Sequence, residues 1–288
     1  MMHTCPYCKN ISNSYFTTHE RHYMWCCACD LIYLNIQKSY NDVVATYGES
    51  HSKRHYVDQI DGSRFRLYDH ILKLIAENAK VGKILDVGTG YGSFLVTARN
   101  RGWDTRGVEP SKQSVSFARR QNNLDIFTGT LQKYAANCQF NVITFINVLD
   151  QSHMPWLEID LASKLLQPGG LIYLRFPNGF LHSCLFRMAQ KCGLSKPLRK
   201  FLIFHIYSFT PRYVRKLLCD HGFDQIKIFN SPSSLGDPHK IFPSPSFATY
   251  VKTVIYFIAK FMEKISRGQL FVGTSLEVTA VKSENPHN

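Results

Sequence analysis

The sequence KILDVGTGYGSFLVTARNRG occupies residues 83–102 of this 288-residue chain. It opens with an apolar run, Ile84–Val87, which has the length and composition of a short buried strand. Three glycines at alternate positions follow, and Ser93–Arg101 then has the pattern of a helix. Glycine suits such a turn because a ligand can approach the backbone closely where no side chain stands. The sequence therefore predicts a strand, a ligand-binding turn and a helix, with the turn glycines at Gly88, Gly90 and Gly92.

An acidic residue ends the next strand. Thr105–Val108 reads as that strand, and Glu109-Pro110-Ser111 follows it. A carboxylate at the tip of a second strand is placed to accept hydrogen bonds from the hydroxyls of a ribose. The nicotinamide dinucleotides and S-adenosylmethionine both carry that ribose, so Glu109 alone does not distinguish them. The dinucleotide fingerprint requires its last glycine where this chain has Ser93, so a nicotinamide coenzyme fits poorly.

The rest of the chain alternates strands with helices, which predicts a doubly wound α/β fold with a mostly parallel sheet. Helices are expected at Ser63–Lys80 and Pro211–His221. Ligands in such sheets bind beyond the carboxyl ends of the strands, where Gly88, Glu109 and Asn147 would lie. Further strands are expected at Asn141–Ile146, Leu171–Phe176 and Phe223–Phe229, with a last antiparallel strand at Ser275–Val281.

Two cysteine pairs lie near the N-terminus. Cys5-Pro6-Tyr7-Cys8 alone could be a redox dithiol, but the four residues before it leave no room for the strand of a thioredoxin-like centre. A second pair with the same spacing follows at Cys26 and Cys29, and Cys27 is a less well spaced alternative to Cys26. Two such pairs form the halves of a tetrahedral four-thiolate zinc site. We therefore predict a structural Zn²⁺ site, with no open position on the metal, at Cys5, Cys8, Cys26 and Cys29.

The composition is that of a globular protein with an uneven positive charge. Hydrophobic residues make up 44% of the chain, and the formal net charge is +13. Leu161–Cys219 contains ten Lys and Arg residues and no Asp or Glu. This stretch is either a solvated basic face or a site for phosphates, nucleic acid or an acidic membrane surface. The sequence has neither a long apolar run nor a signal-peptide core, so we expect a cytoplasmic protein, with peripheral contact at the inner membrane surface as a further expectation.

Five segments occur in a fixed order: ILDVGTGYG, GVEPS, FTGTLQ, FNVITFINVLDQSHMP and LLQPGGLIYLRFPN. Together they resemble the class I S-adenosylmethionine-dependent methyltransferases, in the branch where a small zinc-ribbon-like module precedes the catalytic domain. The resemblance runs from Cys5 to about Lys282. It implies a seven-stranded Rossmann-like sheet, a zinc module at residues 1–37, a connector with the leading helix at 38–80, and a methyltransferase domain at 81–288.

The resemblance also implies which residues bind the cofactor S-adenosylmethionine. Asp86, Gly88 and Gly90 would line the methionine end, and Glu109, beside Pro110, would hold the ribose. Thr130 and Leu131 would flank the adenine. Asn147 and Val148 would lie under the sulfonium. Many relatives have Asp at the position of Thr130 and His at the position of Gln151. Because Gln cannot accept a proton, a base at that position is either lost or replaced by another residue.

An acceptor that is a hydroxyl or a carbon acid needs a base to remove its proton. His153, two residues after Gln151, and His205 are the candidates. Tyr207 is a candidate for orienting them. Each histidine also has a plain structural interpretation, because a lone His is more often structural than catalytic.

Two predicted helical insertions, at about residues 180–206 and 246–268, do not belong to the minimal fold. In the first, one helical face carries Leu181, Cys184, Leu185 and Met188. The second is apolar at intervals from Val251 to Ile265, with lysines beside the apolar positions. Two interpretations remain open: the helices pack only on each other and on the sheet, or they cover the acceptor pocket and contact a membrane surface.

Three functions follow from these observations. The first is methyl transfer from S-adenosylmethionine to the oxygen or carbon of a small-molecule or glycan-linked acceptor, where the basic stretch would meet a phosphate or nucleotide on an acceptor that has one. The second is RNA methylation, with the zinc module and the basic stretch as a clamp. The third is a protein that binds S-adenosylmethionine without turnover, for which the replacement at Gln151 is the best argument. The sequence does not contain the [D/N]-P-P-[Y/F] turn of many base-amino methyltransferases, which disfavours the second function.

Overall fold

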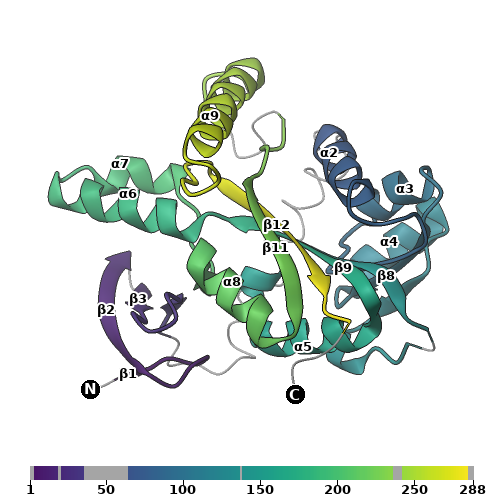
Figure 1. The fold of residues 1–288 in the computed structure, drawn as a ribbon. Coiled ribbons are helices and arrows are strands. Elements are labelled where there is room, and N and C mark those ends of the chain that lie inside the picture. Colours follow the sequence, from purple (N-terminus) through teal and green to yellow (C-terminus); the bar gives the residue numbers. More distant parts are fainter. Residues whose placement is uncertain (1–2, 19–20, 36–63, 137, 236–241, 285–288) are drawn as a thin grey trace.

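The computed structural model describes residues 3–18, 21–35, 64–136, 138–235 and 242–284. Residues 36–63, most of the predicted connector, lie outside the described ranges. The described residues form a seven-stranded sheet and a five-stranded N-terminal sheet. Figure 1 shows the N-terminal strands (purple) beside helix α8 (Pro211–Asp220), on the opposite side of the molecule from helix α2 (Phe65–Ala76).

The large sheet has the predicted Rossmann-like methyltransferase arrangement. Its strand order is β11-β12-β9-β8-β5-β6-β7, and β12 runs antiparallel to both of its neighbours while β5 to β9 are parallel. The strands are β5 Lys83–Val87, β6 Asp104–Glu109, β7 Ile126–Thr128, β8 Phe140–Ile146, β9 Leu166–Pro177, β11 Phe223–Asn230 and β12 Ser275–Lys282. Strand β9 begins earlier than predicted because Leu166 already pairs with Phe140, before a register shift at the Pro168-Gly169-Gly170 turn.

Consecutive residues of β5 point to opposite faces of the sheet, as the two-residue period of a strand requires, and each face is covered by its own layer of helices. Ile84 packs into the cluster formed by α2, α3 (Ser93–Arg99) and α4 (Lys112–Asn122). Leu85 packs into the other cluster, with α5 (Pro155–Leu165) and α8. The sheet is therefore covered by helices on both faces, and its carboxyl edge is left for ligands.

The N-terminal sheet is completed by a strand from the domain that contains the large sheet. Its order is β1-β2-β3-β4-β10, and β10 (Tyr207–Ser208) pairs antiparallel with β4. The other strands are β1 His3–Thr4, β2 Ile11–Thr18, β3 Arg21–Trp25 and β4 Ile32–Leu34. Buried residues of the module also share the core cluster of α5 and α8. The cysteine module is thus packed onto the domain that follows it.

The two insertions form helices whose apolar residues are largely exposed. The first contains α6 (Gly179–Lys191), α7 (Ser195–Leu198) and the 3₁₀ turn η3 (Arg199–Phe201). The second is α9 (Pro245–Ile265), which lies along the outer surface of the molecule (Figure 1). Within the described part of the chain, no helix combines the length and the apolar composition that crossing a membrane would need.

Candidate functional site

The glycine turn after β5 packs closely against the turn after β8. Gly88, Gly90 and Gly92 all have positive φ, at 74°, 56° and 82°. A Cβ atom on Gly88 would lie 2.4 Å from Cγ2 of Val148, which is closer than any tolerated contact. The Gly88 amide donates to the Val108 carbonyl oxygen at 2.7 Å. The turn therefore requires glycine at this position both for its φ angle and for its contact with Val148.

Glu109 holds the glycine turn to the tip of β6. Its Oε2 atom accepts a hydrogen bond from the Gly90 amide at 2.9 Å, and its Oε1 atom accepts one from the Ser111 amide at 2.8 Å. The side chain is buried, and burial raises the pKa of Glu109 above its ordinary value. Each carboxylate oxygen can accept more than one hydrogen bond. Glu109 therefore keeps acceptor capacity for a ligand hydroxyl while it fixes the turn.

Asp86 lies at the end of β5, beneath the turn. Its Oδ1 atom accepts a hydrogen bond from the Thr144 hydroxyl at 2.6 Å, across the neighbouring strand β8. Burial raises the pKa of Asp86 to about 7, although the Thr144 hydrogen bond opposes this shift. A nearby cation, such as the ammonium of a bound amino acid, would favour the ionised form.

The predicted adenine-binding turn follows β7. Glu109 pairs with Thr128 in the sheet, and the Gly129 amide donates to the Glu109 carbonyl oxygen at 3.0 Å. Thr130 then begins the short 3₁₀ turn η1 (Leu131–Lys133), in which Leu131 is buried. Pro110, by contrast, is exposed at the start of the loop after β6. The structure thus places Thr130 and Leu131 one strand away from Glu109, at the same edge of the sheet.

Asn147 directly follows β8, and its backbone lies in the left-handed region, with φ of 58°. Its side-chain Oδ1 atom accepts a hydrogen bond from Nη1 of Arg175 at 2.6 Å. Gln151 donates from Nε2 to the Asn147 carbonyl oxygen at 3.0 Å. Gln151, which stands where many relatives have His, therefore stabilises the turn that carries Asn147 and Val148.

The structure pairs His205 with Asp150. Nδ1 of His205 lies 2.5 Å from Oδ2 of Asp150, and Asp150 is 2% exposed. Because a carboxylate only accepts, this contact places a proton on Nδ1 and leaves Nε2 as the basic nitrogen. Asp150 belongs to the 3₁₀ turn η2 (Leu149–Gln151), three residues after Asn147. The pair has the arrangement of a histidine base with an orienting carboxylate.

His153 and Tyr207, the other two candidate residues, contact each other through the His153 backbone. The Tyr207 hydroxyl donates to the backbone oxygen of His153 at 3.0 Å, and the His153 side chain is exposed. The orienting contact on His205 comes from Asp150, which sequence reasoning missed. Asp150 carries no local signal for this role, because its partner lies 55 residues away in the insertion after β9.

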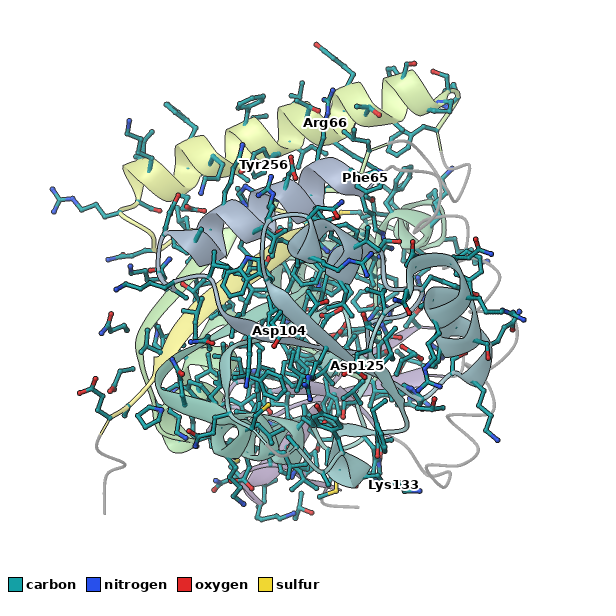
Figure 2. The ribbon with its side chains drawn as sticks, turned by 90° about the vertical axis from the view of Figure 1, so that its right-hand side faces the viewer. Phe65, Arg66, Asp104, Asp125, Lys133 and Tyr256 are labelled. Carbon is teal, nitrogen blue, oxygen red and sulfur yellow. The ribbon has the colours of Figure 1, made fainter. Side chains whose placement is uncertain are left out.

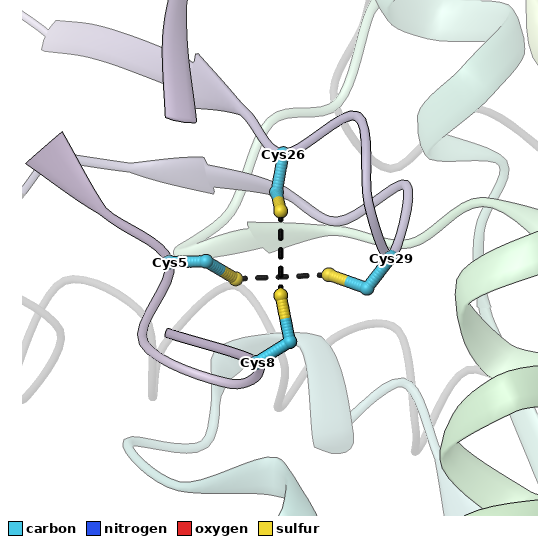
Figure 3. A group of neighbouring side chains, drawn as sticks. All are labelled: Cys5, Cys8, Cys26 and Cys29. Carbon is cyan, nitrogen blue, oxygen red and sulfur yellow. Dashed lines mark hydrogen bonds between the residues drawn. The ribbon is translucent and has the colours of Figure 1, made fainter. Parts of the chain in front are cut away.

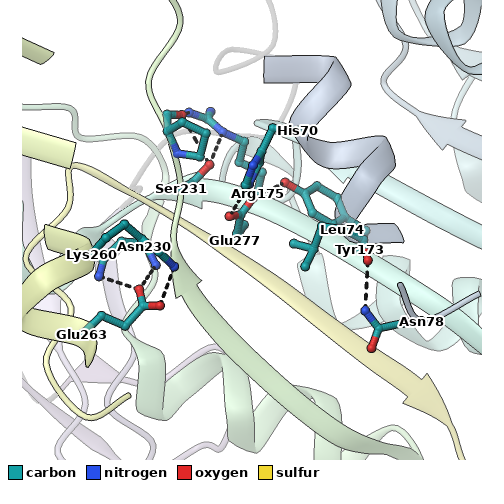
Figure 4. Close-up of polar contacts among 11 residues, drawn as sticks. His70, Leu74, Asn78, Tyr173, Arg175, Asn230, Ser231, Lys260, Glu263 and Glu277 are labelled. Carbon is teal, nitrogen blue, oxygen red and sulfur yellow. Dashed lines mark hydrogen bonds and ion pairs between the residues drawn. The ribbon is translucent and has the colours of Figure 1, made fainter. Parts of the chain in front are cut away.

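Arg175 is a second group that sequence reasoning missed. Arg175 is 6% exposed, and Nη1 of its guanidinium donates to Oδ1 of Asn147. Nε donates to the Ser231 hydroxyl and Nη2 donates to the Pro232 carbonyl oxygen, both at 2.9 Å. All three acceptors are uncharged. Figure 4 shows this guanidinium close to Glu277, which accepts from Tyr173 at 2.9 Å and from His70 at 2.8 Å. Burial lowers the pKa of Arg175.

A cavity of about 290 Å³ lies between α2 and α9. Its walls include Arg66 and His70 of α2, Pro232 in the loop after β11, and Lys252 and Tyr256 of α9. Figure 2 shows α2 and α9 running beside one another, with Arg66 and Tyr256 on the facing helices. The loop after β11 is at the same edge of the sheet as the glycine turn, because β11 and β9 are both antiparallel to β12.

The four predicted cysteine ligands converge in the N-terminal module (Figure 3). The Sγ atoms of Cys5, Cys8, Cys26 and Cys29 all lie within 4.8 Å of one another. The Cys5–Cys29 and Cys8–Cys26 sulfur pairs are 3.6 Å and 3.4 Å apart. A tetrahedral ion with metal–sulfur bonds of about 2.3 Å needs sulfur separations of about 3.8 Å, so the cluster fits such an ion after small shifts of the sulfur atoms.

Burial and contacts among the thiols shift their pKa values in opposite directions. The hydrogen bond with Cys29 lowers the pKa of the Cys5 thiol to about 5, and the same contact raises the pKa of Cys29. Cys27 is exposed and lies outside the cluster. The four converging residues therefore could hold one metal ion with no further protein ligand.

Comparison with known proteins agrees with this geometry. The family described as methyltransferase domain matches residues 60–228. The chain belongs to this methyltransferase family. The match includes the glycine turn, Glu109, Asn147 and the His205–Asp150 pair.

Curated relatives of this methyltransferase are ubiquinone biosynthesis O-methyltransferases. The enzyme from Aliivibrio fischeri is 26% identical over 157 residues, which is 51% of this chain and 67% of that enzyme. The enzyme from Psychrobacter arcticus is 28% identical over 151 residues, which is 49% of this chain and 58% of that enzyme. The similarity spans about half to two thirds of the length of these relatives.

Solved methyltransferase structures share the fold. Magnesium protoporphyrin IX methyltransferase from Synechocystis, with bound SAH, has a TM-score of 0.55 at 14% identity and covers 85% of this chain and 100% of that one. A methyltransferase from Archaeoglobus fulgidus that depends on S-adenosylmethionine has a TM-score of 0.52 at 17% identity and covers 79% and 98% of the two chains. The chain therefore shares the fold of these methyltransferases.

Proposed function

We propose that this methyltransferase transfers a methyl group from S-adenosylmethionine to a hydroxyl of a small-molecule or glycan-linked acceptor, with His205 as the general base. The observation that carries the proposal is the hydrogen bond between His205 and the buried Asp150, in the turn that follows Asn147. The curated relatives support oxygen as the methylated atom, since O-methylation is their named activity.

The residues at the carboxyl edge fit the proposed cofactor. At Gly88 and Gly90 the backbone is bare of side chains, and the Gly88 turn contacts Val148. Glu109 would accept hydrogen bonds from the ribose hydroxyls with the lone pairs that Gly90 and Ser111 do not use. Asp86 would face the methionine ammonium, and Thr130 with Leu131 would flank the adenine. When bound, S-adenosylmethionine supplies a methyl group on a positively charged sulfur.

His205 would carry out the proton transfer. Asp150 holds Nδ1–H of His205, so Nε2 accepts the proton of the acceptor hydroxyl, and the Asp150 carboxylate stabilises the imidazolium that results. Arg175 and Gln151 fix Asn147, which would set the floor of the site on which the acceptor is aligned.

We further propose that the four-cysteine cluster binds a structural Zn²⁺ ion. A zinc ion with four thiolate ligands has no position for substrate. Its role would be to hold the module, which contacts the proposed base: the Tyr23 hydroxyl donates to the His205 carbonyl oxygen at 3.0 Å.

The proposal is tested by incubating the protein with methyl-deuterated S-adenosylmethionine and a metabolite extract, followed by mass spectrometry. We expect a deuteromethyl ether as product, strongly reduced in the His205→Asn variant and retained in a matched control, His22→Asn, on the exposed face of the N-terminal sheet. The His153→Asn variant measures whether the second candidate contributes. Label recovered only in RNA would favour the RNA methyltransferase, and cofactor binding without any labelled product would favour the binding protein.

A further inference from the structure

The cavity between α2 and α9 is lined by basic side chains. Arg66, His70 and Lys252 line it, and none of its described lining residues is acidic. Lys252 lies over the loop after β11, with Nζ 3.4 Å from the Ser234 carbonyl oxygen. Apolar surface is provided by Leu67, Tyr256 and Phe257. A cationic rim beside an aromatic wall fits a molecule with an anionic group and a flat apolar body.

The cavity is connected to the candidate methyl-transfer site through one side chain. Arg175 donates both to Asn147 Oδ1 and to the carbonyl oxygen of Pro232, which lines the cavity. The residues assigned to the cofactor are absent from the described lining, so the cavity is a separate space beside the cofactor site. Its size is at the lower end of the range of about 300–1,000 Å³ for small-molecule sites.

We propose that this cavity is the part of the acceptor site that holds an anionic group of the acceptor, either a carboxylate or a phosphate, while the reacting hydroxyl lies beside the cofactor site. The proposal rests on the proposed function and specifies its substrate class. Arg66 and Lys252 bind the anionic group, and Tyr256 packs against the body of the acceptor.

The test uses four probes of similar size: benzoate, phenyl phosphate, benzyl alcohol and benzylamine. Binding of each to the full chain saturated with SAH is measured by ligand-detected NMR. We expect benzoate or phenyl phosphate to bind at least tenfold more tightly than benzyl alcohol or benzylamine, and the stronger of the two identifies the anionic group. The double variant Arg66→Ala/Lys252→Ala should lose this preference.

The control double variant Lys112→Ala/Arg120→Ala removes the same charge from exposed positions of α4 and should keep the preference. Equal binding of all four probes, no binding of either anion, or an equal loss in both double variants would overturn the proposal. SAH affinity, measured on the same samples, separately tests the cofactor site. A chain that binds SAH but shows no anion preference would contradict only the acceptor class.

A second inference comes from the outer face of α9. Its most exposed apolar residues outside the cavity lining are Tyr250, Phe261 and Ile265, which are 67%, 63% and 62% exposed. The single acidic residue of α9, Glu263, is buried and accepts hydrogen bonds from the backbone and side-chain nitrogens of Asn230 (Figure 4). Of the three lysines of α9, Lys252 lines the cavity and Lys260 lies 2.6 Å from Oε1 of Glu263. Lys264 is the third, and Arg267 follows the helix.

We infer that α9 docks on an anionic lipid bilayer. An amphipathic helix with exposed aromatic residues and basic residues beside them binds at the headgroup boundary, where the apolar side chains enter the acyl region and the cations contact anionic lipids. Glu263 and Asn230 anchor the helix to β11, so the face is presented by a fixed element.

Vesicle flotation tests this inference. We expect the full chain to float with vesicles of phosphatidylcholine and phosphatidylglycerol, and to float less with pure phosphatidylcholine or in high salt. The variant Ile258→Glu/Phe261→Glu should remain at the bottom of the gradient, and the control Ile11→Glu/Val81→Glu, which changes exposed apolar residues elsewhere, should float. No flotation of the wild type, or equal flotation of both variants, would overturn the inference. A concentration-dependent dimer in sedimentation that Ile258→Glu/Phe261→Glu abolishes would also overturn it, because the face would then bind a second copy of the chain.

Discussion

Nδ1 of His205 lies 2.5 Å from Oδ2 of Asp150, and this pair joins the turn after β8 to the insertion after β9. If Asp150 orients the base, the Asp150→Asn variant should lose about 100-fold or more in turnover of the acceptor found by isotope labelling. SAH affinity should be unchanged. Nitrogen-detected NMR of the wild type should show the proton of neutral His205 on Nδ1. Full turnover in Asp150→Asn would assign the pair a structural role only.

The contact between Gly88 and Val148 predicts a specific effect of one methyl group. In Gly88→Ala, the new Cβ would lie 2.4 Å from Val148 Cγ2, so we expect at least a tenfold loss of SAH affinity in calorimetry. Gly193 is the matched control, since it also has positive φ, 72°, but a Cβ there meets nothing within 4 Å. Gly193→Ala should leave the affinity for SAH unchanged. Similar losses in both variants would show that the close approach to Val148 is not what matters.

The buried carboxylate of Asp86 predicts a pH dependence of stability. Its pKa is raised from 3.8 to about 7 in the folded protein. Because the folded state then holds this proton more tightly than the unfolded state, the group favours folding most below pH 4, and this advantage is lost as the pH rises to about 7. Relative to Asp86→Asn, the wild type should lose up to about 1.4 kcal/mol of unfolding free energy per pH unit in this window.

Urea unfolding of both proteins at a series of pH values measures this difference. Glu158 has a pKa raised to about 7 by burial and titrates in the same window, but it is present in both proteins and cancels. A difference that is constant from pH 4 to 7, or that grows in favour of the wild type, would contradict the burial of an unpaired Asp86 charge.

The cysteine cluster predicts one tightly bound zinc per chain. Metal analysis of Cys26→Ser should show loss of zinc, while Cys27→Ser, next to it but exposed and outside the cluster, should retain it. Loss of zinc should also lower turnover, because the module contacts the His205 backbone through Tyr23 and pairs with β10 through β4. Zinc retained in Cys26→Ser, or full activity in a zinc-free protein, would contradict this coupling.

Local patterns predicted the strands of the sheet and the turn after β5 well. Ile84–Val87, the glycine turn and Glu109 each carry their signal within a few residues, because a buried strand and a ligand-binding turn impose composition locally. The structure accordingly has β5, β6 and the antiparallel β12 where the sequence indicated them.

Long-range pairings could not be predicted in this way. Asp150 and Arg175 acquire their positions from partners on other elements, and Tyr207–Ser208 is too short a strand to show periodicity. The face of α6 is a further case, since the structure buries His182 and Ser183 and leaves Met188 exposed. Phe186 and Ala189 are buried on the same face as His182, and His182 Nε2 bonds to the Thr274 carbonyl oxygen. Contacts with distant elements therefore select a different buried face from the one that the spacing of apolar residues predicted.

Calorimetric titration of the full chain with SAH tests the central claim most directly. The claim is that the glycine turn and Glu109 bind the cofactor at the carboxyl edge of the sheet. It predicts saturable binding of one SAH per chain, and a large loss of affinity in Glu109→Ala with the fold retained by circular dichroism. An absence of heat with SAH and S-adenosylmethionine, together with binding of a nicotinamide coenzyme, would contradict it.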